Sequence, residues 1–239
     1  MPSSLVVADY GQVELVMLAH MIGKGKLFEG FHLGIDPHTM HAAGVLRKRP
    51  EDVTKNERQA LGKTLGFTIV NGAGDKKVAQ MAGVSLERGR KILADYDKEF
   101  PEVPAFKRKQ FALARSRRPP YLTSPILGRK RRLPELLSDE KWRRERAERQ
   151  AFNYLIQGGA ADLMKIALVR ADRLLQEHRP EAYLSLTVHD EMVAVSPDEF
   201  AEEVKALIEE AMVGEEMQKL LRVPLKTEAL IVKRWADAK

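Results

Sequence analysis

Strand-like segments near both ends of the chain constrain the fold more than any other feature of the sequence. Residues 5–9 (LVVAD) form an apolar run that ends on an aspartate, which is typical of a short buried strand. Residues 184–195 (LSLTVHDEMVAV) alternate around a His-Asp pair, which predicts a β-hairpin with a polar turn. A closing strand is expected at 225–232. Because helical patterns fill the interval, we expect an α+β fold with a small antiparallel sheet and a helical insertion.

The middle of the chain reads as a series of helices. The helix from Thr54 begins with a T-x-x-E capping box completed by Glu57, and glycines near its end predict where it stops. The segment 36–41 (DPHTMH) is expected to be a loop, and 119–134 a loop or short hairpin. Helices are expected at 14–23, 54–74, 84–100, 103–118, 141–157, 160–178 and 199–212.

Composition excludes several classes of protein. The 239 residues are 44% hydrophobic and 31% charged, which is typical of a globular chain with a real core. No apolar run approaches the roughly 20 residues that span a bilayer, so we expect no membrane partner. The N-terminus lacks the pattern of a signal peptide. With no cysteine, disulfides and thiolate metal sites are excluded, and a cytosolic setting fits.

Positive charge is concentrated in one part of the chain. The formal net charge is +6, but residues 107–149 contain 15 Lys and Arg against 5 Asp and Glu. A basic block on an otherwise mildly acidic chain favours a polyanion such as nucleic acid, and a solvated surface is the alternative.

The two aspartates at the strand ends suggest a metal site. If their segments are neighbours in one sheet, Asp9 and Asp190 converge. A carboxylate pair without His or Cys suits Mg²⁺, with substrate phosphates as further ligands. The alternative is that each aspartate simply ends a strand or occupies a turn.

The helix from Thr54 places a cation beside an aromatic ring. Gln59, Lys63 and Phe67 recur at four-residue spacing and therefore share a face, and Asn71 follows on the same stripe. Such a face can hold a phosphate and stack on a sugar or base; the alternative is a lysine whose stem packs beside a core phenylalanine.

Two other motifs give weaker indications of a functional site. The GKT string is not a P-loop, because position 57 is Glu where that motif needs Gly. His38 and His41 have no evident third ligand nearby, and we interpret them as structural or polar-surface residues.

Three segments in order resemble the sequence motifs of the family A DNA polymerases. DYGQVEL is similar to motif A, RQALGKTLGFTIVNG to motif B, and VHDE to motif C. DPHTMHA, FPEVPAF, LGRKRRLP, AFNYLIQGGAADLMK and Trp235 agree in the same order. The resemblance implies the right-hand polymerase fold without its thumb: palm at 1–35, fingers at 36–150 with the motif B helix at about 54–71, and palm again at 151–239.

The resemblance also implies roles. It predicts a template-directed DNA polymerase that adds deoxynucleotides to a primer 3′-hydroxyl by a two-metal mechanism, with two Mg²⁺ ions and Mn²⁺ as an alternative. Glu14 would exclude a ribose 2′-hydroxyl. The implied metal ligands are Asp9, Asp190 and the backbone carbonyl of Tyr10; the implied catalytic residues are Asp9, Asp190, Glu191 and Lys63. The implied nucleotide-binding residues are Tyr10, Gln12, Glu14, Arg58, Lys63, Phe67 and Asn71. The implied DNA-binding residues are Arg129, Arg131, Arg149, Asn153, Gln157 and His189.

The implied partners are primer–template DNA, dNTPs, and a separate polypeptide or upstream segment that carries the thumb and an exonuclease. The setting would be the cytoplasm of a bacterial or phage-infected cell, with a phage split polymerase as one origin. A catalytically weak or inactive DNA-binding subunit or remnant is the alternative function. Single-subunit RNA polymerases have a palm that works in the same way, but Glu14 and Glu191 favour a DNA polymerase.

The sequence departs from the family pattern in places. Gln59 stands where an arginine is usual, which predicts weaker nucleotide binding, and Asn71 stands where a tyrosine is usual, which predicts looser base selection or a shifted Glu14. Only eight residues precede Asp9, so no thumb is expected within this chain.

Overall fold

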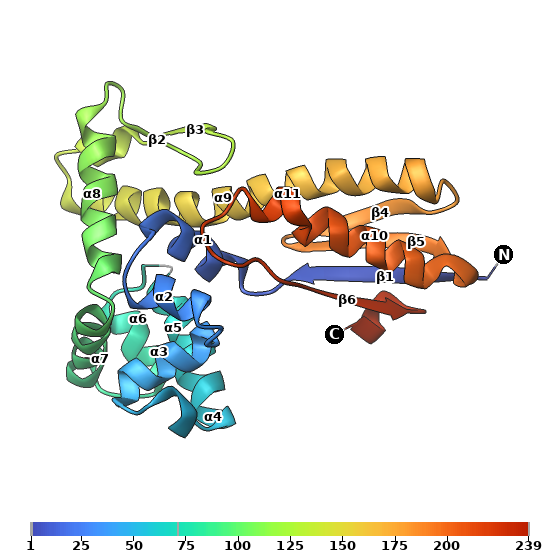
Figure 1. The fold of residues 1–239 in the computed structure, drawn as a ribbon. Helices are drawn as coiled ribbons and strands as arrows, with labels where there is room; N and C mark the ends of the chain where they lie inside the picture. Colours follow the sequence, from blue (N-terminus) through green and yellow to red (C-terminus); the bar gives the residue numbers. More distant parts are fainter. Residues whose placement is uncertain (1, 71, 239) are drawn as a thin grey trace. The chain divides into compact units, whose positions relative to one another are not determined.

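The structure is a computed structural model that describes residues 2–70 and 72–238 (Figure 1). The expected α+β class is confirmed, because both ends of the chain build a small antiparallel sheet and helices fill the middle. No described helix is long and apolar enough to cross a membrane.

The chain divides into two compact units. The sheet unit comprises residues 1–17 and 157–239, and the helical unit comprises residues 18–156. The three-part division expected from the sequence stays a prediction.

The sheet of the sheet unit has four antiparallel strands in the order β4–β5–β1–β6. Its strands are β1 (Ser3–Tyr10), β4 (Tyr183–Val188), β5 (Glu191–Pro197) and β6 (Thr227–Val232). β1 lies between strands from the other end of the chain, and Asp9 is opposite Glu191 on one side and Glu228 on the other. The expected hairpin and closing strand are therefore present.

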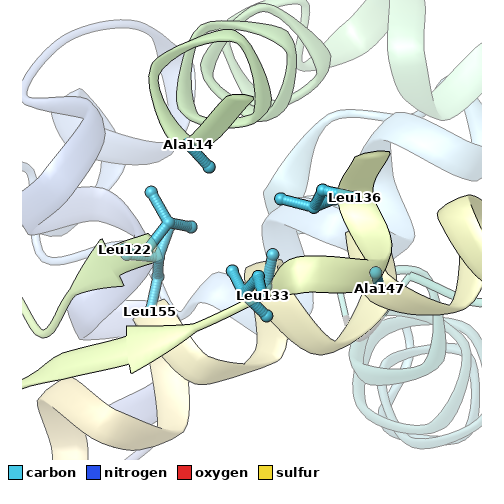
Figure 2. Packing of buried hydrophobic residues seen from close by; sticks show 7 residues of the cluster. Ala114, Leu122, Leu133, Leu136, Ala147 and Leu155 are labelled. Carbon is cyan, nitrogen blue, oxygen red and sulfur yellow. The ribbon is translucent and has the colours of Figure 1, made fainter. Parts of the chain in front are cut away.

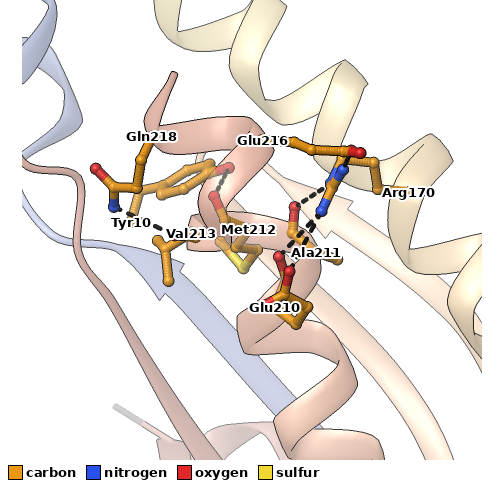
Figure 3. Close-up of polar contacts among 8 residues, drawn as sticks. All are labelled: Tyr10, Arg170, Glu210, Ala211, Met212, Val213, Glu216 and Gln218. Carbon is orange, nitrogen blue, oxygen red and sulfur yellow. Dashed lines mark hydrogen bonds and ion pairs between the residues drawn. The ribbon is translucent and has the colours of Figure 1, made fainter. Parts of the chain in front are cut away.

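One face of this sheet is covered by α10 (Ala201–Val213), which packs on β1, β5 and β6. Val6, Ala8 and Tyr10 alternate along β1 and are buried on that face. The Tyr10 hydroxyl donates a hydrogen bond to the Met212 carbonyl at 3.0 Å (Figure 3). η4 (Asp198–Phe200), α11 (Glu215–Gln218) and η5 (Trp235–Ala238) complete this part of the chain.

An arginine of α9 (Lys141–His178) ties that helix to α10 and α11. Arg170 is paired with Glu210 at 3.7 Å and also with Glu216, and its Nε donates to the Ala211 carbonyl at 3.3 Å (Figure 3). These contacts fix the C-terminal end of α10, where the Met212 carbonyl receives Tyr10.

The helical unit contains a hydrophobic cluster that fastens a small hairpin between two helices (Figure 2). Leu122 and Leu133, from the hairpin and its exit, pack with Ala114 of α8 and Leu155 of α9. The elements of this unit are α1 (Val13–Ile22, which begins in the sheet unit), α2 (Lys26–His32), α3 (Pro37–Leu46), η1 (Pro50–Asp52), α4 (Lys55–Glu57), η2 (Arg58–Leu65), α5 (Gly66–Val70), α6 (Asp75–Ala82), α7 (Leu86–Glu99), α8 (Glu102–Ser116), β2 (Tyr121–Thr123), β3 (Lys130–Arg132), η3 (Pro134–Leu137) and the first part of α9.

Three local expectations were wrong. The segment 36–41 is not a loop, because Asp36 caps α3 by accepting from the Thr39 amide at 2.7 Å and Pro37 occupies the first helical position. The helices expected at 141–157 and 160–178 are one helix, α9.

The third difference lies in the helix expected from Thr54. It begins with the expected capping box, but residues Arg58–Leu65 form a π-helix, η2, between α4 and α5. A π-helix bonds residue i to residue i+5, so residues four positions apart in this segment do not share a face as they would in an α-helix.

Candidate active site

A two-residue turn brings the second aspartate to the end of β1. β4 ends at Val188 and β5 begins at Glu191, so His189 and Asp190 form the turn. His189 has a φ of 58°, a left-handed conformation that costs a residue with a Cβ about 1 kcal/mol. The Tyr10 amide donates to the Asp190 carbonyl at 3.2 Å. This bond joins the end of β1 to the turn.

Four acidic residues, which we call the carboxylate cluster, gather at this end of the sheet: Asp9, Asp190, Glu191 and Glu228. Burial is the largest cause that raises the pKa of Asp9 to about 6. The charges of Asp190, Glu191 and Glu228 raise that pKa further. Within the described part of the chain, no lysine or arginine forms an ion pair with any member of the cluster.

The cluster fits a divalent cation in charge and in donor type. Carboxylate oxygens are the ligands that Mg²⁺ prefers, and the uncompensated negative charge that raises the pKa of Asp9 also attracts a metal cation. Among the described residues, no three acidic, His or Cys side chains already surround one point as ligands would. The fit therefore rests on electrostatics and on the nature of the donors.

Two contacts from the C-terminal strand and turn hold parts of the cluster. The Thr227 hydroxyl donates to the Asp9 carbonyl at 2.8 Å. The Trp235 indole N–H donates to Oε1 of Glu191 at 2.6 Å. In the sequence, Trp235 is only a marker of resemblance, and Glu228 carries no signal, since its place opposite Asp9 depends on strand register.

The residues after Asp9 begin α1. The Tyr10 ring is buried against α10, so its backbone rather than its ring is left for the predicted ligand role. Gln12 has a φ of 55°, and its carbonyl accepts from the amides of Leu15 and Val16 at 3.0 and 3.1 Å, which starts the helix. Glu14 lies in the first helical turn and is half-buried.

In the helical unit, the candidate nucleotide-binding segment is η2 with α5. The Lys63 side chain is exposed on η2. The Arg58 guanidinium is held by Asp36 through two bonds, Nε to Oδ2 at 2.7 Å and Nη2 to Oδ1 at 2.8 Å. The Phe67 side chain and the whole of Asn71 lie outside the described residues.

Glycines let η2 and α5 approach α3 closely. A Cβ at Gly62 would lie 2.0 Å from the His38 carbonyl oxygen, and one at Gly66 would lie 2.3 Å from Nδ1 of His41. His38 and His41 are buried, which confirms a structural place for them and excludes a polar surface. Burial, followed by the charge of His38, lowers the pKa of His41 to about 3.

Basic side chains at the β2–β3 hairpin lie against aromatic rings. Arg117 and Lys130 lie 4.3 and 5.2 Å from the centroid of the Tyr121 ring. Arg131 lies 5.6 Å from the Tyr154 ring, and the Tyr154 hydroxyl donates to the Arg129 carbonyl. These contacts hold the basic hairpin in a defined shape, as a phosphate-binding surface requires.

Three further predicted DNA contacts recur along α9 at four-residue spacing: Arg149, Asn153 and Gln157. Arg149 and Gln157 are exposed. The Asn153 carbonyl oxygen Oδ1 is buried and has no hydrogen-bond partner among the described residues, so its capacity as an acceptor is unused in the structure.

Comparison with known proteins places this geometry in context. The family model described as DNA polymerase family A matches residues 1–237. A thermostable DNA polymerase I of Thermus filiformis is 38% identical over 236 residues, covering 98% of this chain and 27% of that protein. A DNA polymerase I of Geobacillus stearothermophilus is 36% identical over 235 residues, covering 98% of this chain and 26% of that protein.

A solved structure agrees. It is described as the POL domain of Pol1 from M. smegmatis in complex with DNA primer-template and dNTP. It matches with a TM-score of 0.87 and 30% identity, covering 97% of this chain and 40% of that one. The chain thus spans about a quarter of the length of the curated relatives it matches.

Proposed function

Because this chain belongs to DNA polymerase family A, we propose that it is the catalytic region of a template-directed DNA polymerase, which adds deoxynucleotides to a primer 3′-hydroxyl. The observation that carries the proposal is the carboxylate cluster at the paired ends of β1 and β5, where burial and then shared negative charge raise the pKa of Asp9 and no described cation offsets that charge.

The sheet unit would hold the metal ions. Asp9, Asp190 and the Tyr10 carbonyl would be the ligands, and Glu191 would support them. Two Mg²⁺ ions bound there would lower the pKa of the primer hydroxyl and offset charge on the phosphates, with Mn²⁺ as an alternative. Gln12 and Glu14, at the start of α1, would contact the incoming nucleotide, with Glu14 excluding a 2′-hydroxyl.

The helical unit would bind the triphosphate and sugar. Lys63 is exposed on η2 and would neutralise phosphate charge, with Phe67 and Asn71 further along the same segment. Arg58 would join the nucleotide site only by leaving Asp36, which holds it by two bonds in the structure.

DNA would be gripped mainly through phosphates, which gives affinity without sequence information. The mycobacterial neighbour was solved with DNA primer-template and dNTP, and we extend both ligands to this chain. The proposed contacts are Arg129, Arg131, Arg149, Asn153, Gln157 and His189. We propose that a thumb, from an upstream segment or a separate polypeptide, completes the grip, and that the protein works in the cytoplasm of a bacterial or phage-infected cell.

The deciding experiment is Mg²⁺-dependent extension of a primer–template by the purified chain. We expect extension by the wild type, loss in Asp190→Asn, and retention in Asp172→Asn, which removes an exposed carboxylate of α9 outside the site. Extension that survives Asp190→Asn would refute the proposed role of the cluster.

The second candidate is a DNA-binding subunit with little or no chemistry of its own. Gln59 in place of the usual arginine favours it, because the nucleotide site then has one cation fewer. Duplex binding without extension, unchanged when the upstream polymerase region is supplied in trans, would select this function.

A further inference from the structure

The indole of Trp235 is bonded to a carboxylate of the cluster. Its Nε1–H donates to Oε1 of Glu191 at 2.6 Å, a short distance for a charge-assisted bond. The bond engages one of the two carboxylate oxygens and leaves Oε2 available. Trp235 is partly buried and lies at the first residue of η5, just past β6.

Electrostatics alone would not keep Glu191 in this place. Glu191 lies opposite Asp9 across the β1–β5 ladder and adds to the negative field that acts on it. Like charges repel, so a free glutamate side chain here would gain by turning towards solvent. The indole N–H can only donate a hydrogen bond, so it binds the carboxylate and opposes this movement.

The turn that carries the indole is itself closed locally. Arg234 pairs with Asp237 through bonds of 2.7 and 3.1 Å, and the Asp237 amide donates to the Arg234 carbonyl at 2.9 Å. Lys233 pairs with Asp198 at 2.5 Å and fastens the end of β6 to η4. The position of Trp235 is therefore set by bonds that do not involve the cluster.

We propose that Trp235 is a positioning residue of the metal site, holding Glu191 within the carboxylate cluster so that the cluster binds a divalent cation. This inference rests on the proposed function for the identity of the cation site, but not on polymerase activity. Outer-shell donors of this kind typically change metal affinity by about tenfold or more when they are removed.

The first experiment measures Mn²⁺ binding by the full chain from the loss of the free-ion electron paramagnetic resonance signal. Trp235→Phe keeps an aromatic ring and removes only the N–H donor. We expect it to weaken Mn²⁺ binding about tenfold while the unfolding temperature stays close to that of the wild type. Trp142→Phe is the matched control, since Trp142 is exposed on α9, and it should leave the affinity unchanged.

Glu191→Gln tests whether the effect passes through Glu191. The single changes Trp235→Phe and Glu191→Gln should each weaken binding, and the double variant should be no weaker than Glu191→Gln alone. Additive losses would mean that Trp235 acts on the fold in general, and would overturn the proposal.

A spectroscopic readout follows from the tryptophan count. The chain has two tryptophans, so Trp142→Phe leaves Trp235 as the sole indole emitter. Its fluorescence should change saturably with Mn²⁺ at the concentration found by resonance, and Glu191→Gln should reduce that response. Unchanged Mn²⁺ affinity in Trp235→Phe would overturn this proposal alone. Absence of Mn²⁺ binding by the wild type would overturn it together with the metal site, whereas binding without primer extension would count against the proposed activity only.

Discussion

Replacing Gly62 with alanine should destabilise the helical unit, although glycine is a poor helix residue. A Cβ at this position would meet the His38 carbonyl at 2.0 Å from the oxygen and 2.7 Å from the carbon. Real Cβ atoms essentially never have contacts under 3.0 Å, so η2 or α3 would have to shift. The obstacle is backbone in a capped helix, which cannot rotate away as a side chain would.

The magnitude follows from two opposing terms. Glycine to alanine inside a helix gains at most about 1 kcal/mol. Overpacking a tight contact costs about 1–3 kcal/mol, and the upper part of that range applies because the contact is with backbone. The net loss is therefore about 1–2 kcal/mol, which lowers a urea midpoint by roughly 0.5–1 M.

The assay uses the two tryptophans, which fall in different units. In a Trp235→Phe background, Trp142 fluorescence follows the helical unit during urea unfolding. Gly74→Ala is the control for an open position, because its Cβ would meet nothing within 4 Å and its φ is −81°; since Gly74 is the N-cap of α6, this change should cost only about 0.5 kcal/mol. A Gly62→Ala protein as stable as the Gly74→Ala control would refute the close-packing argument.

Three further predictions concern electrostatics and backbone strain. Asp9→Asn should stabilise the metal-free chain above pH 6 and not at pH 4. The pKa of Asp9 in the folded state is raised from 3.8 to about 6, so the wild type loses stability as the pH rises from 3.8 to about 6, and the variant does not. The full shift corresponds to about 3 kcal/mol, which solvent screening of a half-exposed group reduces to about 1–2, and thermal unfolding at both pH values measures it. Asp36→Asn keeps an N-cap but breaks the pair with Arg58, so chemical unfolding should show a loss of about 1 kcal/mol in stability. Asp95→Asn breaks an exposed pair with Arg47, at the other end of α3, and should cost only a few tenths of a kcal/mol. Equal losses in the two variants would contradict this prediction. His189→Gly should gain about 0.5–1 kcal/mol in thermal unfolding by relieving the left-handed φ of 58°, and a loss of stability would count against strain at the turn.

The strands were predictable because their signals are local. The continuous apolar run ending at Asp9 and the alternation around His189 can each be read from a few residues, and the structure places both segments in one antiparallel sheet. Register is not local: Glu228 joins the cluster only because β6 pairs with β1 in one particular alignment.

The helices illustrate the same limit. The Thr54 capping box was predictable from four residues and is present. The π-helix after it was not, because it coincides with the contact between Gly62 and the His38 carbonyl, which is a tertiary contact. The helix at Pro37, which was expected to be a loop, has a usable start signal in the sequence, Asp36 followed by Pro37.

The predicted aspartates are brought together, but other parts of the site needed coordinates. Nothing in the sequence says that Arg58 is held by Asp36, since the two residues are 22 positions apart and neither belongs to a motif that pairs them. The bond from Trp235 to Glu191 spans 44 positions and is likewise invisible in the sequence.

The central position of β1 has a consequence for how the chain folds during synthesis. β1 leaves the ribosome before its two neighbours in the sheet, β5 and β6, which are made roughly 180–230 residues later. The helical unit is continuous in sequence and can close before either neighbour exists. At about 5–20 residues per second, the strand that carries Asp9 waits some 10–40 seconds with both edges unpaired. An apolar strand exposed for that long is a site for misassociation, so nascent-chain aggregation, rather than instability of the finished sheet, should limit the yield of this protein.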